Sequence, residues 1–411
     1  QVNTYTNDAQ SGSSITNLAD GGFVVTWKSD GQDGDGWGIF AQLYDRSGAA
    51  SGAEFQVNTY TTGHQGHEWS SFPEVASLTD GGFVILWDSI GQDGDDYGVF
   101  AQRYDSSGNT SGAEFQVNTY KTGLQGWPNV AGLNDGGFVV TWQSEGQDGS
   151  SGGVFGQRYN SSSLKSGSEF QVNNYTSNYQ ANYSVEDLAG GGFVVTWASR
   201  DQDGDDYGVY SQLYDSAGFK SGGEFRVNTW TSGKQSYPDT AGLSDGGFVV
   251  TWSSYGQDPG DSNSEIGIYG QLFDNSGTTI GSEFRVNTTT DQIQQNSSVT
   301  SLSDGGFVVT WRDGNWDGNG IHGQRYDSLG TVVGSEFQVS SPDTAEQRNG
   351  DVTALADGGF VVSWNYWGQD GDSNGIYAQR FDASGNKVEQ VQSPPLIIDF
   401  NNTASSGLES V

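Results

Sequence analysis

A short pattern of apolar residues recurs along the whole chain. The segment Gly-Gly-Phe-Val-Val-Thr-Trp, or a close variant, begins at Gly21, Gly81, Gly136, Gly191, Gly246, Gly305 and Gly358. Its aromatic and β-branched residues are typical of a strand buried on both faces, and the preceding glycines suit a tight turn. Successive copies start between 53 residues (Gly305 to Gly358) and 60 residues (Gly21 to Gly81) apart. Self-similarity at such a period indicates seven copies of one structural unit.

Each unit reads as four short strands. In the second copy they cover residues 73–78, 83–87, 97–104 and 114–118, with Gly- and Asp-rich turns between them and no helical period. Four antiparallel strands per unit are typical of a β-propeller blade; β-helix coils are much shorter, and immunoglobulin-like units need about 100 residues. We therefore predict an all-β fold, a single seven-bladed β-propeller over residues 1–392. Residues 393–411 are predicted to be a linker or the start of a following module.

The two ends of the repeat region predict how the ring closes. Six units end in Glu-Phe-(Gln/Arg)-Val, with the phenylalanine at Phe55, Phe115, Phe170, Phe225, Phe284 and Phe337. The seventh unit has residues 388–391 in that place, and the chain opens with Gln-Val-Asn, the remainder of the same motif. We predict that the N-terminal strand completes the last blade, which removes a free sheet edge. The alternative is that residues 388–391 fill the position alone.

Several residues recur in every unit and are predicted to be structural. Tryptophans end the buried strand at Trp27, Trp87, Trp142, Trp197, Trp252, Trp311 and Trp364, and packing between blades explains them better than sugar binding. One glutamine recurs before the first strand, at Gln10, Gln65, Gln125, Gln180, Gln235, Gln294 and Gln347. A second recurs in the third strand, at Gln42, Gln102, Gln157, Gln212, Gln271, Gln324 and Gln379. Both are predicted to bond a neighbouring blade.

Composition narrows the class of partner. Lys and Arg total 16 and Asp and Glu total 51, which gives a formal net charge of −35. Such a surface repels nucleic acid and anionic membranes and attracts cations; solubility in salty or extracellular surroundings is the other explanation. No apolar run approaches the roughly 20 residues of a membrane-spanning helix. The chain has no cysteine, so disulfides do not contribute to its stability. It also has no methionine, not even at position 1, so we expect an excised or processed form.

The loop between the second and third strands predicts a cation site. Alternating Asp and Gly offers carboxylates and inward-turned carbonyls, the oxygen ligands that Ca²⁺ takes. The candidate ligands are Asp33, Asp35, Asp93, Asp95, Asp203, Asp205, Asp370 and Asp372. The spacing of a full EF-hand loop is absent, and Asp-Gly is also ordinary turn chemistry.

The same face is predicted to carry the variable loops that join one unit to the next, which is where a binding surface is built. Aromatic residues gather in these loops and beside them. Those that we expect to stack on sugar rings are Trp37, Trp69, Tyr97, Trp127, Tyr207, Trp316 and Trp367. The alternative is that they pack the loops onto the blades.

The runs Gly-Gly-Phe-Val-Val-Thr-Trp, Gly-Gln-Asp-Gly-Asp and Gly-Val-Phe-Ala-Gln-Arg-Tyr-Asp resemble repeats of very large secreted bacterial proteins, many of which carry hemolysin-type (RTX) calcium-binding repeats. The Asp-rich loops also resemble those of integrin-like propellers. The resemblance covers residues 1 to about 392 and implies a secreted or cell-surface location, adhesion and a calcium-rich setting. The chain departs from both families, because tandem RTX nonapeptides and the integrin calcium spacing are absent.

Three functions follow. The first is a calcium-stabilised binding or adhesion module that recognises a glycan or another cell-surface partner through the Asp-Gly-Asp face. The second is a polysaccharide-degrading enzyme, a lyase or a glycosidase, whose acid–base residues would come from His64, His67 and Glu68 in the inserted loop of the second unit. The third is a structural subunit of a surface layer or filament.

Overall fold

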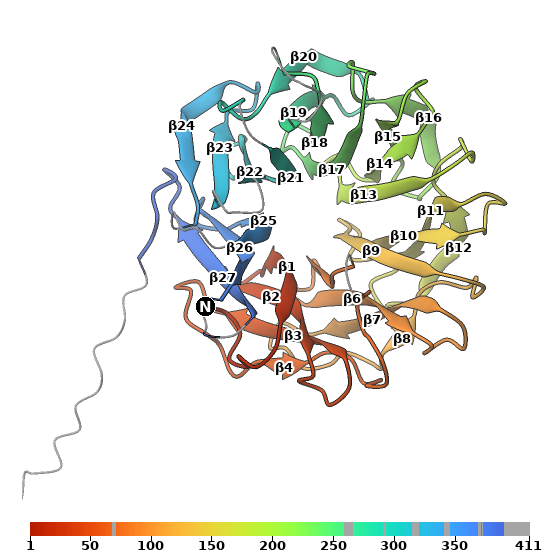
Figure 1. Cartoon of the computed structure of the whole chain (residues 1–411), viewed down its shortest axis with the longest axis vertical. Helices are drawn as coiled ribbons and strands as arrows, with labels where there is room; N and C mark the ends of the chain where they lie inside the picture. The colour runs from red at the N-terminus through yellow and green to blue at the C-terminus, as the bar shows by residue number, and fades with distance from the viewer. Residues whose placement is uncertain are drawn as a thin grey trace, which may run out of the picture.

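The computed structural model describes residues 1–67, 71–258, 266–290, 293–314, 320–340, 346–368, 371 and 373–389. In these residues the chain forms seven antiparallel sheets, and Figure 1 shows them as blades around a central opening. All regular structure in this part of the chain is β-strand. The predicted seven-bladed β-propeller is therefore confirmed. The described residues contain no helix with the length and apolarity needed to cross a membrane.

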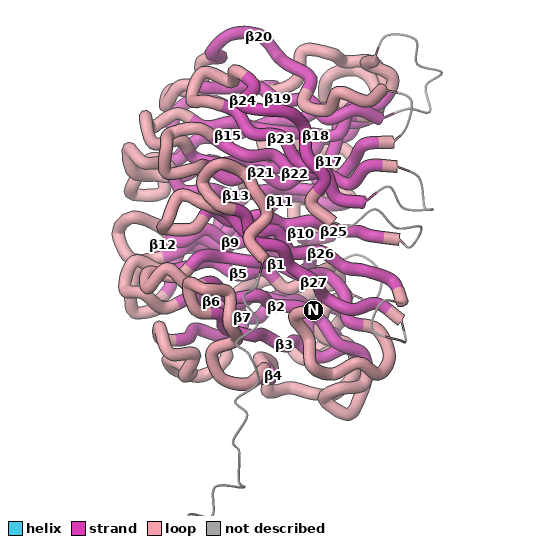
Figure 2. Tube along the Cα trace, turned by 90° about the vertical axis from the view of Figure 1, so that its left-hand side faces the viewer, coloured by secondary structure: helices cyan, strands magenta, loops and turns pink. Residues whose placement is uncertain are grey.

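Within each blade the strands follow chain order from the opening to the rim, and they run between two loop-bearing faces (Figures 1 and 2). The innermost strands are β1 (Gln10–Asn17), β5 (Glu74–Ser77), β9 (Gln125–Gly132), β13 (Gln180–Asp187), β17 (Gln235–Gly242), β21 (Gln294–Ser301) and β25 (Gln347–Ala354). The second strands are β2 (Phe23–Asp30), β6 (Phe83–Ile90), β10 (Phe138–Glu145), β14 (Phe193–Arg200), β18 (Phe248–Tyr255), β22 (Phe307–Asp313) and β26 (Phe360–Trp367). The third strands are β3 (Trp37–Tyr44), β7 (Tyr97–Tyr104), β11 (Gly152–Tyr159), β15 (Tyr207–Tyr214), β19 (Ile266–Phe273), β23 (Gly320–Tyr326) and β27 (Asn374–Phe381). The outer strands are β4 (Phe55–Gln56), β8 (Phe115–Gln116), β12 (Lys165–Gln171), β16 (Lys220–Arg226), β20 (Thr279–Arg285) and β24 (Val332–Gln338).

The core lies between blades rather than inside them. Each apolar cluster combines residues of two adjacent blades; one joins Leu18 and Ile39 of the first blade to Val75 and Trp87 of the second. The repeated tryptophan is at most 1% exposed in six blades, and Trp364 is 8% exposed. The prediction that these tryptophans pack between blades is confirmed.

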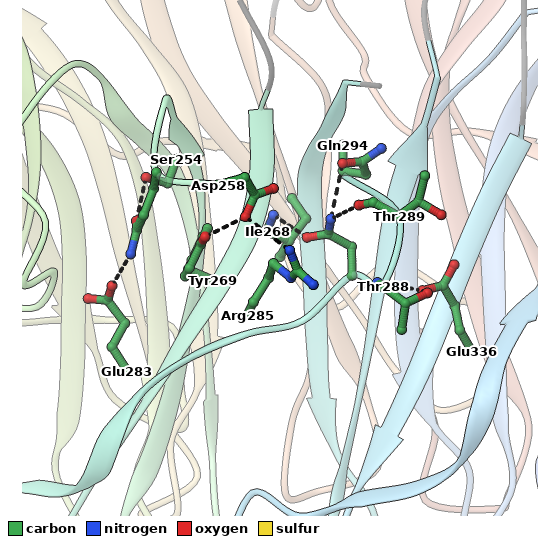
Figure 3. Close-up of polar contacts among 12 residues, drawn as sticks. Ser254, Asp258, Ile268, Tyr269, Glu283, Arg285, Thr288, Thr289, Gln294 and Glu336 are labelled. Carbon is green, nitrogen blue, oxygen red and sulfur yellow. Dashed lines mark hydrogen bonds and ion pairs between the residues drawn. The ribbon is translucent and has the colours of Figure 1, made fainter. Parts of the chain in front are cut away.

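A polar clasp repeats at the blade junctions, and Figure 3 shows it between the fifth and sixth blades. Asn287 accepts the backbone N–H of Ile268 at 2.7 Å through Oδ1 and donates to Oε1 of Gln294 in the next blade at 3.0 Å. The carboxylate of Glu336 accepts the N–H of Thr288 at 2.9 Å. Equivalent amide pairs are Asn3–Gln10, Asn58–Gln65, Asn118–Gln125, Asn173–Gln180 and Asn228–Gln235. In six of the seven copies the first repeated glutamine therefore bonds a neighbouring blade, as predicted.

The second repeated glutamine serves its own blade, so the prediction for it was wrong. Gln157 Nε2 donates to the carbonyl of Arg158 at 2.9 Å and to that of Gly167 in the outer strand at 3.2 Å. The physical reason is a register shift between the third and outer strands at this point. A bulge leaves carbonyls outside the strand ladder, and the amide satisfies them.

The N-terminal segment completes the seventh blade. The N–H of Val2 donates to the carbonyl of Ile376 at 2.7 Å, and Asn3 Oδ1 accepts the N–H of Ile376 at 2.7 Å. Val57 and Asn58 make the same two bonds to Ile39 in the first blade. The predicted closure is therefore confirmed.

The C-terminal side contributes the beginning of the same outer edge. The N–H of Val388 donates to the carbonyl of Arg380 at 2.9 Å, as the N–H of Ser51 does to Leu43 in the first blade. The outer edge of the seventh blade is thus built in two pieces, whereas the alternative assigned it to residues 388–391 alone. Residues 390 and 391 of that alternative lie outside the described residues.

Candidate functional site

The innermost strands enclose a channel of about 620 Å³ along the ring axis. One position of each strand forms a polar ring inside it, made of Ser14, Glu74, Asn129, Ser184, Asp239, Ser298 and Asp351. Serines donate to carboxylates of the next blade: Ser14 to Glu74 at 3.1 Å, Ser184 to Asp239 at 2.9 Å and Ser298 to Asp351 at 2.9 Å. The channel is therefore acidic and internally hydrogen-bonded.

The blades differ from one another at a buried position of the second strand. The residue after the repeated tryptophan differs in all seven copies: Lys28, Asp88, Gln143, Ala198, Ser253, Arg312 and Asn365. All seven are buried. We call this the clamp position, because three of its residues bond the backbone of a neighbouring innermost strand and a fourth, Lys28, bonds the segment that precedes β5.

The bonds to β1, β9 and β21 fall on one irregular point of each strand, and His67 lies in the segment before β5. Asp88 accepts the N–H of Trp127 at 3.2 Å and that of His67 at 2.8 Å. The Lys28 ammonium donates to the His67 carbonyl at 2.7 Å. Asn365 accepts the N–H of Gly12 at 3.1 Å, and Ser253 accepts that of Asn296 at 3.1 Å. Polar groups that leave the strand ladder are thus satisfied by the clamp position.

The irregular point is a bulge in the pairing of the first and second strands. Its residue has a left-handed backbone, with φ of 67° at Gly12, 52° at Trp127, 54° at Tyr237 and 55° at Asn296. For a bulky residue this conformation costs about 1–2 kcal/mol, and such strain gathers at functional sites. At Trp127 and Tyr237 the bulge carries an aromatic ring at the mouth of the channel.

Beside the mouth lies a second cavity, of about 340 Å³, which we call the aromatic pocket. Its size falls within the range of small-ligand sites. Indole and phenol rings line it together with two amides and one carboxylate. The lining residues are Phe72, Glu74, Trp127, Pro128, Asn129, Gln143, Tyr179, Ala181 and Tyr183. Tyr183 of the fourth blade donates to the carbonyl of Gly126 at 3.1 Å, which fixes its ring against the third blade.

Glu74 lies where the aromatic pocket meets the channel. Burial raises the pKa of its carboxyl well above its usual range, and the charges of Asp351 and Asp239 add to the effect. Ser14 opposes the shift through its hydrogen bond. The pocket therefore holds a carboxyl group that keeps its proton to a higher pH than an exposed glutamate does.

The structure brings three of the predicted site residues together. The ring of His67 lies 5.0 Å from that of Tyr97 and 5.6 Å from that of Trp127. Lys28 links Trp37 to this group, because its ammonium bonds the His67 carbonyl and lies 5.0 Å from the centre of the Trp37 ring. His64 instead accepts the backbone N–H of Trp37 at 3.3 Å through Nδ1.

The remaining predictions fall in other places. Tyr207 begins β15 in the fourth blade, and Trp367 ends β26 with 53% of its surface exposed. Glu68, Trp69 and Trp316 lie outside the described residues. Whether any of these residues binds a ligand stays a prediction.

The Asp-Gly-Asp loops hold the chain in place. Asp33 accepts the amide of Asn58 at 3.1 Å, and Asp35 accepts the N–H of Gly63 at 3.0 Å. Asp95 and Asp205 accept the equivalent N–H of Gly123 and Gly233. The corresponding first carboxylates, Asp93 and Asp203, face Gln116 and Asn228. The two carboxylates of a loop thus point to different partners.

Within the described residues, no group of three or more His, Cys, Asp or Glu side chains is placed to hold a metal ion. Asp370 and Asp372 lie outside these residues. Calcium binding stays a prediction.

The prediction from sequence missed the clamp residues, Glu74 and the tyrosines of the aromatic pocket. The sequence signal for these residues was a position that differs among the repeats, not one that recurs in them. The clamp position changes in every copy, although the tryptophan before it never does. A buried position that varies among otherwise similar repeats indicates that each blade contributes a different group to one shared site.

The chain matches no protein-family model and no curated protein. Among solved structures it is similar to polysaccharide lyase Uly1, with 12% identity over 92% of this chain and 91% of that one and a TM-score of 0.55. It is similar to the α-L-arabinofuranosidase Arb93A from Fusarium graminearum, with 12% identity over 93% and 95% and a TM-score of 0.52. The β-propeller domain of the Trilobed protease from Pyrococcus furiosus has 8% identity over 95% and 99% and a TM-score of 0.51. At these identities the likeness shows the fold alone.

Proposed function

We propose that the chain binds a polysaccharide at the aromatic pocket beside the channel mouth. The observation that carries the proposal is the composition of the pocket walls. Trp127, Tyr179 and Tyr183 supply ring faces, and Gln143 and Asn129 supply amide groups, around a cavity of about 340 Å³. Sugar rings stack on aromatic faces while their hydroxyl groups bond to amides and carboxyls.

Two further features support the proposal. The strained backbone of Trp127 is held by the buried Asp88, so its position does not depend on a ligand. A side chain fixed in advance loses less entropy on binding. The similar propellers named above include a polysaccharide lyase and an arabinofuranosidase, so this fold accommodates carbohydrate ligands. Adhesion to a glycan-covered surface would use the same pocket.

Isothermal titration calorimetry against a panel of soluble neutral and acidic polysaccharides tests the proposal. We expect Trp127→Ala and Gln143→Ala each to weaken binding by about tenfold or more, because each removes a wall of the pocket. Phe219→Ala is the matched control, since Phe219 is 71% exposed in a turn between the third and outer strands. Unchanged affinity in both pocket variants would overturn the proposal.

Glu74 favours a second function, cleavage of the bound polysaccharide. A carboxyl with a raised pKa at the wall of a sugar pocket suits a general acid, which must still carry its proton near neutral pH. Product release from any polysaccharide that binds can be followed by reducing-end assay and by absorbance of unsaturated sugars. We expect Glu74→Gln to abolish release and to leave binding within about twofold. Absence of products with every polysaccharide that binds would leave binding as the function.

A further inference from the structure

Two cations, Lys234 and Arg200, contact the same aromatic ring, that of Tyr207. The protein has 51 acidic side chains for 16 basic ones, and its repeated arginines form ion pairs, such as Arg158 with Asp135 at 2.9 Å and Arg325 with Asp304 at 3.1 Å. In the described part of the chain, Lys234 and Arg200 form no ion pair and contact aromatic rings instead, although the carboxylate of Asp206 acts on Lys234 from nearby.

The rings that surround Lys234 are three tyrosines. Its ammonium lies 5.6 Å from the ring centre of Tyr207, 5.1 Å from that of Tyr237 and 5.7 Å from that of Tyr255. The guanidinium of Arg200 lies 5.9 Å from the ring centre of Tyr207. Aromatic faces attract a cation without neutralising it, so the positive charge remains available to a ligand. Burial lowers the pKa of Lys234, and the nearby Asp206 opposes this shift.

This tyrosine cluster adjoins the aromatic pocket. Tyr237 carries the strained bulge of the fifth blade, is 39% exposed and lines the channel. Tyr179, which lines the aromatic pocket, accepts the backbone N–H of Arg200 at 2.9 Å through its carbonyl. Residues of the fourth blade thus connect the pocket to the cluster, as a site for an extended chain of sugars requires.

We infer that Lys234 and Arg200 form a subsite for an anionic group, a carboxylate or a sulfate, on a polysaccharide that also occupies the aromatic pocket. The inference rests on the proposed function and narrows its ligand to acidic polysaccharides. Tyr237 offers the ring face on which the charged sugar stacks, and the two cations bond its anionic oxygens. The acidic remainder of the surface disfavours anionic polymers that do not reach this subsite.

Titration calorimetry with three polymers tests the inference: polygalacturonate, its fully methyl-esterified form, and a sulfated neutral polysaccharide. We expect the wild type to bind at least one anionic polymer about tenfold more tightly than the neutral ester, and this binding to weaken with added salt. Which anionic polymer binds more tightly distinguishes carboxylate from sulfate recognition. The double variant Lys234→Gln/Arg200→Gln should lose this preference, and Lys234→Arg should keep most of it.

Lys121→Gln is the matched control, because Lys121 is an exposed lysine in a loop joining two blades; it should change affinity by less than about twofold. Thermal unfolding of each variant verifies that it folds. Equal binding of acid and ester, unchanged by the double variant but lost in Trp127→Ala, would overturn the anionic subsite and leave the pocket proposal standing. Loss of anionic binding in the double variant but not in Trp127→Ala would uphold the subsite and overturn the pocket. No binding of any polymer would overturn both.

Discussion

Two adjacent positions of the second strand have different roles, one in packing the blades together and one at the channel mouth. The tryptophan is the same in all seven copies and is buried between blades, while the clamp residue that follows it is different in all seven. Every blade junction must pack in the same way for the ring to close, so the tryptophan cannot vary. Three clamp residues, Asp88, Ser253 and Asn365, each bond the bulge of a different innermost strand. The seven blades thus contribute seven different side chains at this position. Residues that are identical in all repeats therefore belong to the scaffold, and buried residues that differ among the repeats belong to the candidate site.

Truncation of each of these two neighbouring residues in one blade should have very different effects on stability. Trp142→Ala should lower the free energy of unfolding by about 3–5 kcal/mol, because it leaves a large cavity between two blades. Gln143→Ala should cost less than about 1 kcal/mol, because Gln143 lines the aromatic pocket rather than the core. Urea unfolding followed by tryptophan fluorescence and circular dichroism measures both. Equal losses would contradict the separation of scaffold and site.

The scaffold could be predicted from the sequence because its signals are local and repeated. Seven copies of Phe-Val-Val-Thr-Trp or a close variant indicate the blade number, and the incomplete motif at Val2 and Asn3 indicates the closure. The aromatic pocket could not be predicted in the same way. Glu74, Gln143 and Tyr183 come from three blades and are separated by tens of residues, so only the ring brings them together.

The bulges were not predicted from the sequence. Trp127 was predicted to lie in or beside a variable loop; it lies within β9, at a bulge with a left-handed backbone, and its side chain lines the pocket. The bond from Asp88 that supports this conformation comes from the preceding blade. No local signal contains it.

One ring contact that recurs at the other blade junctions has no counterpart among the described residues at the seam between the seventh and first blades. At six junctions the phenylalanine of the outer strand packs on a ring of the next blade, as Phe55 does on Tyr104 at 5.4 Å. At the seam the corresponding ring is Tyr44. It borders a cavity of about 530 Å³ that Phe23, Val361 and Ala378 also line, next to Gln1.

Extending the chain by Glu-Phe before Gln1 should restore the regular junction. We expect the free energy of unfolding to rise by about 1–3 kcal/mol, because a phenyl ring is buried against Tyr44. An extension by Glu-Ala is the control for chain length and charge. Denaturant unfolding of the three proteins gives the values. An equal gain from both extensions would show that the ring does not enter the cavity.

Carboxyl groups of the channel are expected to make the stability of the fold depend on pH. The pKa of Glu186 is raised to about 8, mainly by burial, and that of Asp351 to about 6. Between its unfolded and folded pKa values such a carboxyl binds more protons in the folded state, so stability falls as pH rises from about 4.5 to 8. Glu186→Gln removes this cost and can still accept the N–H of Gly242.

We expect Glu186→Gln to raise the free energy of unfolding by about 1–2 kcal/mol at pH 8.5 and to change it little at pH 4.5. Asp96→Asn removes the same charge from an exposed loop position and isolates the general relief of repulsion in a chain of net charge −35. Unfolding curves at pH 4.5, 6 and 8.5 test the difference between the two variants. If Asp96→Asn gives the same pH-dependent gain, charge repulsion across the whole surface determines how stability changes with pH. If it does not, the buried carboxyl groups of the channel determine this change, and their ionisation destabilises the folded propeller.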